Sequence, residues 1–462
     1  MKKQILLILF TIVLTALTLT SCSDDKSNPI AVLPSSIELS TTEHDFGVIE
    51  AGDELTWSLT VFNRGDALLV LDSITISNPA FSVEYSADDM EIGAGLNRLL
   101  GVTFAPDTVG EYYGVLKVYS NDAESPEVPV ELWGVVERAE VSLPEPWLLA
   151  ANYSDGAGNL SLMNLSTMNV TNAAAGLGNN PNDIAKSGNF IYVVNTVSND
   201  MNVVEIMDDL SLVSHDAVDL GIEVNTSPEF VAVDDDGLLY ITNFNTNNVS
   251  VYDPHAGEIV AEIPVGITPM DIEIFDGKAF VCNSAFNFDD FSYGQGTVSV
   301  IDLASRTSTE FNTSTNPQYI DVDDNGMLHV VCTGNYGDVE GTILKVNPNS
   351  LEIVSTIPIG GKPAQIAFGA GDIAYVCAFG EWGEDNPGLV FRYNILDGTV
   401  LNDVSNPIEV GNGAARIVAA SDGSVYISCY GADRVDHLVG DVLVSSHPIG
   451  DGPTPLLFID ID

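Results

Sequence analysis

The sequence predicts an all-β protein in which an immunoglobulin-like β-sandwich precedes a seven-bladed β-propeller. Three observations lead to this prediction. Short strands with turn signals at regular spacing fill residues 37–137. A proline that opens a short apolar strand then recurs every 41 to 51 residues, which is the period of a four-stranded propeller blade. The last copy is cut short, and residues 147–180 supply the missing part of a blade.

Length and charge set the limits on organisation and on partners. At 462 residues the chain exceeds one ordinary hydrophobic core, so two or more domains are expected. Asp and Glu number 66 against 15 Lys and Arg, which leaves a net charge of -51. A field of this sign repels the phosphates of nucleic acids, so we expect no nucleic-acid partner.

The first 36 residues predict a signal segment and a tether. A basic start is followed by an apolar run that ends at Ser21, and Leu19 to Cys22 resembles the bacterial lipobox. This resemblance implies that residues 1–21 are removed and that Cys22 carries lipid; the alternative is a plain secretory signal. The acidic tether, residues 22–36, contains Asp24-Asp25, which resembles the export tag of Bacteroidota surface lipoproteins. We therefore expect a surface-exposed outer-membrane lipoprotein of a Gram-negative bacterium, held by its acyl chains alone.

Residues 37–137 alternate apolar and polar side chains in short strands, as a β-sandwich does. Asp45-Phe46-Gly47, Asn63-Arg64-Gly65 and Phe104-Ala105-Pro106 occur in the order seen in ASH/Hydin-like domains. The resemblance extends to choice-of-anchor surface proteins and implies a spacer or protein-contact module without chemistry of its own. Residues 138–146 are expected to form the linker.

Residues 147–462 are expected to form the propeller. Each repeat continues from its first strand through a turn into a second strand, a polar loop and a third strand. Residues 455–462 supply only a first strand, and residues 147–180 supply the rest, so the two ends should complete one blade and close the ring. Residues 240–266 resemble the YVTN repeat of YncE-like seven-bladed propellers. The repeats open at Pro181, Pro228, Pro269, Pro317, Pro363, Ala414 and Pro455.

Four cysteines remain after Cys22, each in an apolar strand of a different repeat. We interpret them as small buried residues, although one disulfide between neighbouring strands is a possibility that the sequence leaves open. They are Cys282, Cys332, Cys377 and Cys429.

Polar and aromatic residues gather at one end of the predicted propeller, here called the top, where the first strands begin and the loops between second and third strands lie. Aromatic side chains in polar loops suggest the rim of a pocket for a ring-bearing ligand or a sugar, unless the long loops merely pack their own rings. The predicted ligand-binding residues are Asn182, Asp183, Glu229, Phe230, Phe244, Asp271, Phe286, Gln318, Tyr319, Gln365, Phe379, Trp382, Arg416 and Tyr430.

Calcium is the one cofactor that the sequence suggests. Asn182, Asp183, Glu229 and Asp271 have the residue types with which calcium-dependent lactonase propellers hold their metal. No histidine stands at a strand start, and His329 fits a core position, so Asp183 or Asp271 would have to act as the base. Otherwise no cofactor is expected.

The sequence therefore favours non-catalytic binding of a small molecule, a glycan or a protein. One related class is the YncE-like lipoproteins of Bacteroidota that capture corrinoids and pass them to an outer-membrane transporter. The alternatives are a calcium-dependent lactonase or esterase, and an adhesive or structural surface scaffold.

Overall fold

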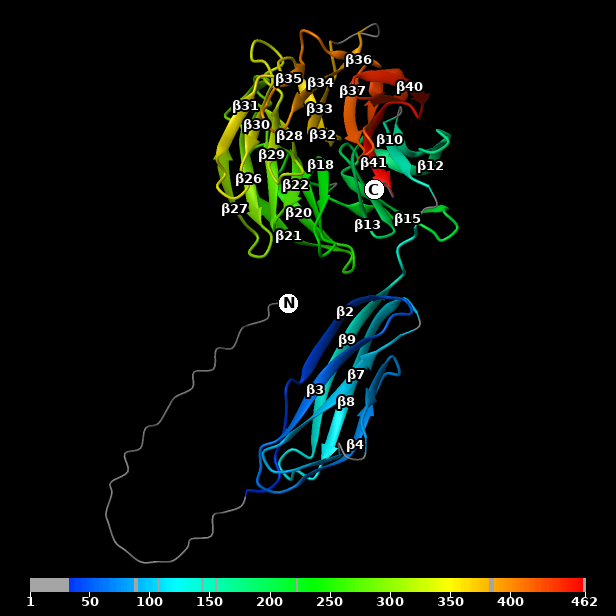
Figure 1. Cartoon of the computed structure of the whole chain (residues 1–462), viewed down its shortest axis with the longest axis vertical. Coiled ribbons are helices and arrows are strands. Elements are labelled where there is room, and N and C mark those ends of the chain that lie inside the picture. The colour runs from blue at the N-terminus through cyan, green and yellow to red at the C-terminus, as the bar shows by residue number, and fades with distance from the viewer. Residues whose placement is uncertain are drawn as a thin grey trace, which may run out of the picture. The chain divides into compact units, whose positions relative to one another are not determined.

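The computed structural model describes residues 33–86, 90–106, 108–142, 145–153, 156–221, 223–381 and 386–459. Cys22 and Trp382 lie outside these residues, as do the predicted signal segment and most of the tether. The chain forms two units, residues 1–139 and 140–462, each with its own core (Figure 1). Among the described residues, no helix has the length and apolar character needed to cross a membrane.

The first unit is a β-sandwich of two sheets with the strand orders β1-β3-β7-β5 and β2-β9-β8-β4-β6. In β8, the last seven residues are alternately more and less buried, because one face of the strand packs into the core. The strands are β1 Ile37–Leu39, β2 Glu43–Glu50, β3 Leu55–Asn63, β4 Leu69–Ile76, β5 Phe81–Glu84, β6 Glu91–Ile92, β7 Asn97–Phe104, β8 Gly110–Ser120 and β9 Glu127–Glu137.

The described residues of the second unit form seven sheets of four or five strands and one two-stranded hairpin. The first three sheets consist of β10 Trp147–Asn152, β11 Ala157–Asn164, β12 Val170–Asn179 and β41 Pro453–Ile459; of β13 Pro181–Ser187, β14 Phe190–Asn195, β15 Asp200–Ile206, β16 Leu212–Ser214 and β17 Val218–Asp219; and of β18 Pro228–Val233, β19 Leu239–Asn243, β20 Asn248–Asp253 and β21 Glu258–Pro264.

The remaining sheets follow in chain order. They consist of β22 Pro269–Phe275, β23 Lys278–Asn283, β26 Thr297–Asp302 and β27 Thr307–Asn312; of β28 Pro317–Val322, β29 Leu328–Cys332, β30 Thr342–Val346 and β31 Ile353–Ile357; of β32 Pro363–Gly369, β33 Ile373–Ala378, β34 Gly388–Asn394, β35 Val400–Asn402 and β36 Ile408–Val410; and of β37 Ala414–Ala419, β38 Ser424–Cys429, β39 Arg434–Val439 and β40 Val442–Pro448. The hairpin is β24 Phe286–Asn287 with β25 Ser292–Tyr293, and a 3₁₀ turn spans Tyr430–Ala432.

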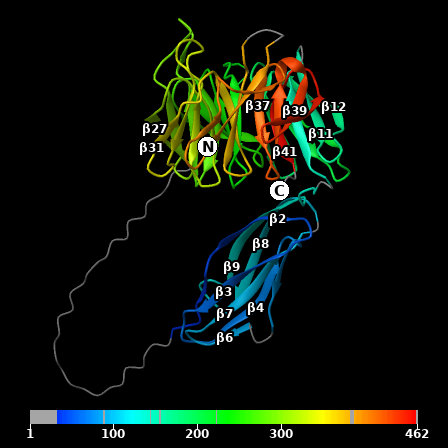
Figure 2. The same cartoon turned by 45° about the horizontal axis from the view of Figure 1, so that its top comes forward.

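The first strands of these sheets contact one another in a closed cycle, β13, β18, β22, β28, β32, β37 and β41 (Figures 1 and 2). Each sheet is therefore a blade, and the predicted propeller architecture is confirmed. Strand β41 pairs with β10, so segments from both ends of the unit form one blade. One detail of the prediction was wrong. Pro453, rather than Pro455, pairs with Asn152 at the end of the adjacent strand, as Pro181 pairs with Asn195.

An asparagine at the end of the second strand holds the loops at the top of four blades. In the fourth blade, Nδ2 of Asn283 donates to the hydroxyl oxygens of Thr297 and Ser299 on the third strand, at 3.0 and 2.9 Å. Gly266 lies against this amide, and a Cβ at Gly266 would stand 2.6 Å from Cγ of Asn283. The equivalent asparagines are Asn152, Asn195 and Asn243.

Neighbouring blades bury both faces of the second strands, which explains their nearly continuous apolar sequences. The four cysteines lie in these strands. As predicted, they are buried, and the structure holds them as free thiols.

Candidate binding site on the propeller

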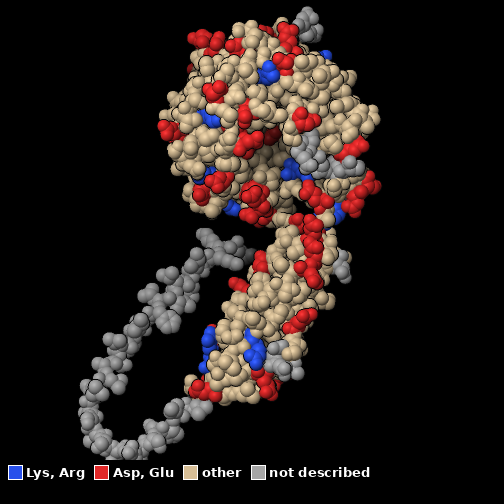
Figure 3. Space-filling view, in the orientation of Figure 1, with Lys and Arg blue, Asp and Glu red and all other residues tan. Residues whose placement is uncertain are grey.

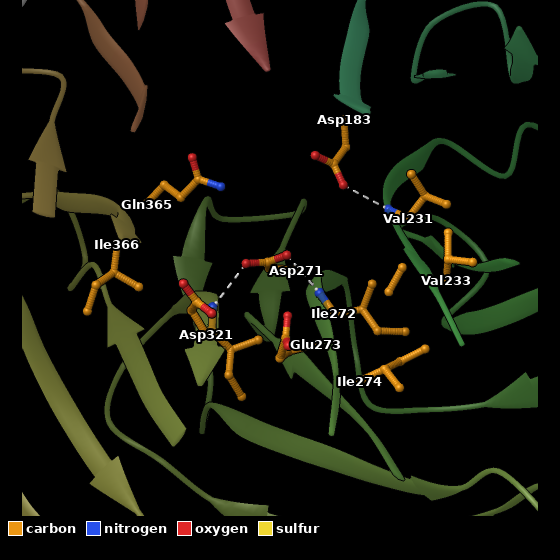
Figure 4. A pocket seen from close by; sticks show the side chains of 12 residues that line it. Asp183, Val231, Val233, Asp271, Ile272, Glu273, Ile274, Asp321, Gln365 and Ile366 are labelled. Atoms are coloured by element: carbon orange, nitrogen blue, oxygen red, sulfur yellow. Dashed lines mark hydrogen bonds between the residues drawn. The ribbon is translucent and has the colours of Figure 1, made fainter. Parts of the chain in front are cut away.

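In three blades, the second residue after the start of the first strand projects into the channel and joins its blade to the next (Figure 4). A carboxylate oxygen of Asp183 accepts the N–H of Val231 on the next blade, and Asp271 does the same for Ile320, both at 3.0 Å. Gln365 likewise accepts the N–H of Ile417 at 3.0 Å. First strands form the inner edges of their sheets, so their inward N–H groups lack a strand partner and need such acceptors. We call these three residues the clamps.

The blades that alternate with these contribute one cationic and two aromatic side chains to the same level of the channel, namely Arg416, Phe230 and Tyr319. Arg416 is only 6% exposed, and its guanidinium lies 5.2 Å from the ring centroids of both Phe230 and Tyr319. Its Nη1 donates to the Tyr319 hydroxyl at 2.8 Å, and its Nη2 donates to the carbonyl oxygen of Asn182 at 3.1 Å. Arg416 thus ties its own blade to three others and forms, with the clamps, a layer across the channel.

The first residue after the strand start is the one that faces the top. Glu229 occupies this place in the third blade and accepts a hydrogen bond from Nδ2 of Asn182 at 2.9 Å. Burial raises the pKa of Glu229 to about 7, although the charge of Arg416 opposes the shift. Met270 and Gln318 occupy the same place in the next two blades.

Above Arg416 lies a cavity of about 490 Å³, here called the arginine cavity. It carries two cationic side chains, Arg416 and Lys362, beside aromatic and apolar groups. It therefore offers rings for stacking, and a ligand's acidic group could replace the exposed Glu381, which accepts from Nζ of Lys362 at 3.1 Å. Its lining is Gln318, Tyr319, Thr333, Tyr336, Lys362, Pro363, Ala364, Phe379, Gly380, Ala414, Ala415 and Arg416.

A second cavity at the top, of about 240 Å³, shares Gln318 with the first and is here called the aromatic cavity. Phe286 and Tyr293 face it from the β24–β25 hairpin, with ring centroids 5.2 Å apart. Phe244 faces it from the loop after β19, and its ring contacts Phe288 at 5.6 Å between centroids. The lining is Glu229, Phe244, Met270, Ser284, Phe286, Tyr293 and Gln318.

Below the layer lies a third cavity of about 320 Å³, here called the acidic cavity, where Asp183, Asp271, Glu273 and Asp321 approach one another (Figure 4). The space-filling view shows acidic side chains inside the central hollow of the propeller (Figure 3). Burial is the largest cause of the raised pKa of each of these groups, which reaches about 6 for Asp183, 7 for Asp321 and 9 for Glu273. The two aspartates on either side add to the shift of Glu273.

The predicted site residues therefore divide into three groups. Glu229, Phe244, Phe286, Gln318, Tyr319, Phe379 and Arg416 line the two top cavities. Asp183, Asp271 and Gln365 line the acidic cavity as clamps. Asn182 supports Glu229 and Arg416, Phe230 is 1% exposed beneath Arg416, and Tyr430 packs on Tyr153 outside the cavities named here.

Sequence reasoning missed three charged residues of these cavities. Glu273 and Asp321 follow on the same first strands as predicted residues, two positions after Asp271 and Tyr319. The alternation of a strand would have pointed both toward the channel. Lys362 directly precedes Pro363, the proline at the start of a blade, and no repeated pattern in the sequence distinguishes this position.

The described residues contain no group of three or more His, Cys, Asp or Glu side chains arranged to hold a metal ion. Of the four residues suggested as calcium ligands, Asn182 and Glu229 bond each other, while Asp183 and Asp271 accept backbone N–H groups. His329 is fully buried, as predicted for a core residue, and its two ring nitrogens bond Tyr393 and Asp323. Lys345 also donates to Asp323, at 3.1 Å.

The fold and the site define an all-β protein with an Ig-like domain and a propeller that is hollowed at its top. Residues 35–134 match the family model of the HYDIN/CFA65/VesB-like Ig-like domain, so the first unit contains a domain of this class. A comparison with curated proteins found no match.

Among solved structures, the chain is similar to 6-phosphogluconolactonase-like proteins of Bacteroides. The protein from Bacteroides fragilis has a TM-score of 0.53 at 12% identity, over 68% of this chain and 98% of that one. The protein from Bacteroides uniformis has a TM-score of 0.52 at 15% identity, over 69% and 100%. A functionally unknown protein from Desulfotomaculum acetoxidans has a TM-score of 0.51 at 15% identity, over 68% and 99%. At these identities the likeness shows the propeller fold alone.

Proposed function

We propose that the propeller binds a ring-bearing small molecule through its top face and does not transform it. The observation that carries this proposal is the pair of adjoining cavities, which meet at Gln318 and carry aromatic side chains beside opposite charges. Two neighbouring cavities of this size, with Gln318 in the lining of both, suit one extended ligand with distinct polar ends. Corrinoids and oligosaccharides are the first compounds to test, with a protein partner as the further possibility.

The proposed location is the outer membrane, with acyl chains on Cys22 and the propeller outside the cell, where an outer-membrane transporter could receive the ligand. This part rests on the lipobox-like sequence and on Asp24-Asp25 alone. Labelling cells with a radioactive fatty acid should mark the protein, and Cys22→Ser should abolish the label. Protease added to intact cells should then cleave the protein if it lies on the surface.

Thermal unfolding of residues 23–462 tests the binding proposal against its alternatives. A ligand present at a hundredfold its dissociation constant should add about 2.7 kcal/mol of stability, so a corrinoid or oligosaccharide that binds raises the Tm of the propeller. Gln318→Ala should reduce the rise because it removes a polar contact that lines both cavities. A loss of stability in chelator, with no effect of any organic ligand, would instead support the calcium-dependent hydrolase. No shift with either treatment would leave a scaffold for another macromolecule.

A further inference from the structure

We propose that the aromatic cavity is a subsite for an organic cation, a quaternary ammonium or protonated amine head group. The inference rests on the proposed function, since it names the chemistry that one of the two top cavities would accept. Three aromatic rings, a methionine thioether and one carboxylate converge on this cavity, and no basic side chain lines it.

The aromatic rings supply the first attraction. The face of an aromatic ring is electrically negative, so a cation held against several rings is stabilised without a direct ion pair. Phe286 and Tyr293 stand on the two strands of one hairpin, and Phe244 comes from the neighbouring blade. The rings of Phe286 and Phe288 are 5.1 Å apart between centroids, and Phe288 also contacts Phe244. Phe288 therefore connects the hairpin to the loop of the neighbouring blade.

The carboxylate of Glu229 supplies the second attraction. It lines the cavity from the start of β18, where Asn182 and Ser227 hold it by hydrogen bonds of 2.9 and 3.4 Å. Arg416 is the opposing charge and acts on Glu229 as well as on Asp183 and Asp271, but it lines the other cavity. The aromatic cavity itself is lined by one acid and no basic residue, and the whole chain is negative, with a net charge of -51.

The size of the cavity suits a head group rather than a whole ligand. A volume of about 240 Å³ is below the range of roughly 300–1,000 Å³ in which drug-sized molecules bind. The remainder of the molecule would continue past Gln318 into the arginine cavity, whose Arg416 and Lys362 could bind an acidic group. A ligand with a cationic and an anionic end would match both cavities.

Calorimetric titration of residues 23–462 with choline tests the inference. The control ligand is 3,3-dimethylbutan-1-ol, which has the shape of choline with carbon in place of the charged nitrogen. Choline should bind at least about tenfold more tightly than this alcohol in 150 mM salt, where non-specific attraction to the acidic surface is screened. Phe286→Leu and Glu229→Gln should each weaken choline about tenfold. Phe311→Leu, on the outermost strand of the same blade, should leave the affinity unchanged.

The possible failures point to different conclusions. Equal affinity for choline and the alcohol would overturn the inference, because only apolar contact would then act. Choline affinity that survives both Phe286→Leu and Glu229→Gln would place the cation elsewhere and would equally overturn it. If choline does not bind while a corrinoid or oligosaccharide still raises the Tm, the cation subsite is wrong and the proposed function stands. Glu229→Gln keeps the shape of the side chain, so its Tm shows whether the fold is intact.

Discussion

Glu273 lies between Asp271 and Asp321 in the wall of the acidic cavity, and this environment favours its protonated form in the folded state. Its pKa rises to about 9, while in the unfolded chain it would titrate near 4. Between these values the folded state keeps a proton that the unfolded state has lost. The free energy of unfolding must therefore fall as the pH rises from about 4 to 9, and at higher pH this contribution is gone.

Glu273→Gln should remove the share of this dependence that Glu273 contributes, because the amide needs no proton to remain neutral, while Asp183 and Asp321 keep theirs. We expect the Tm of the propeller at pH 8 to increase by roughly 2 °C or more, with little change at pH 5. Calorimetry at the two pH values measures the effect. Glu258→Gln, on an exposed position of β21, serves as the control. An equal change at both pH values would show that the carboxylate does not carry the pH dependence.

The clamp residues were predicted as ligand-binding groups, and in the structure they form hydrogen bonds that join neighbouring blades. Asp271→Ala leaves the N–H of Ile320 without its acceptor and should reduce the free energy of unfolding by about 1–3 kcal/mol. Asp271→Asn keeps an acceptor oxygen and should cost less than half as much. Chemical denaturation of both variants measures these losses in the free energy of unfolding. Equal losses would mean that the charge of Asp271, rather than this hydrogen bond, stabilises the ring.

At the scale of the blade, Gly266 lies against the asparagine that holds the top loop of the fourth blade. Gly266→Ala places a methyl group against Asn283, whose amide must move away from Thr297 and Ser299. We expect a loss of about 1–3 kcal/mol in the free energy of unfolding. Gly176→Ala is the matched control, because no atom lies within 4 Å of the added carbon.

A double-mutant cycle makes this test specific. In the background of Asn283→Ala the space beside Gly266 is open, so Gly266→Ala should cost much less there. An unchanged cost would show that backbone freedom, and not the contact with Asn283, explains the glycine.

The elements were easier to predict from the sequence than the contacts between them. A proline and a turn repeated at blade spacing, together with apolar second strands, reveal the propeller because each blade is built from local segments. The hydrogen bond from Ile320 to Asp271 joins residues 49 positions apart, and no local pattern contains it. Pro453 and Pro455 look alike in sequence, and only the pairing with Asn152 distinguishes them.

At the scale of the molecule, strand β41 closes the ring by pairing with β10 and contacting β13 and β37. Deletion of residues 453–462 would expose the inner edge of β10 and remove the contacts of β13 and β37 with β41. We expect the cooperative thermal transition of the propeller to disappear, while that of the Ig-like unit remains, since its core is separate. Calorimetry of the shortened chain checks this. Survival of both transitions would mean that the remaining blades hold the ring closed without β41.

The alternation along the first strands also has an evolutionary consequence. In five blades the residue just after the strand start lines the top cavities, as Glu229 and Gln318 do, while the next residue, such as Asp271 or Arg416, bonds other blades. Ligand contact and ring assembly therefore fall largely on adjacent positions of these repeats, and Tyr319 and Arg416 take part in both. Substitutions at the first position can therefore change which ligand the protein binds without breaking the contacts between blades. These first positions offer a protein engineer five places at which to change the ligand specificity.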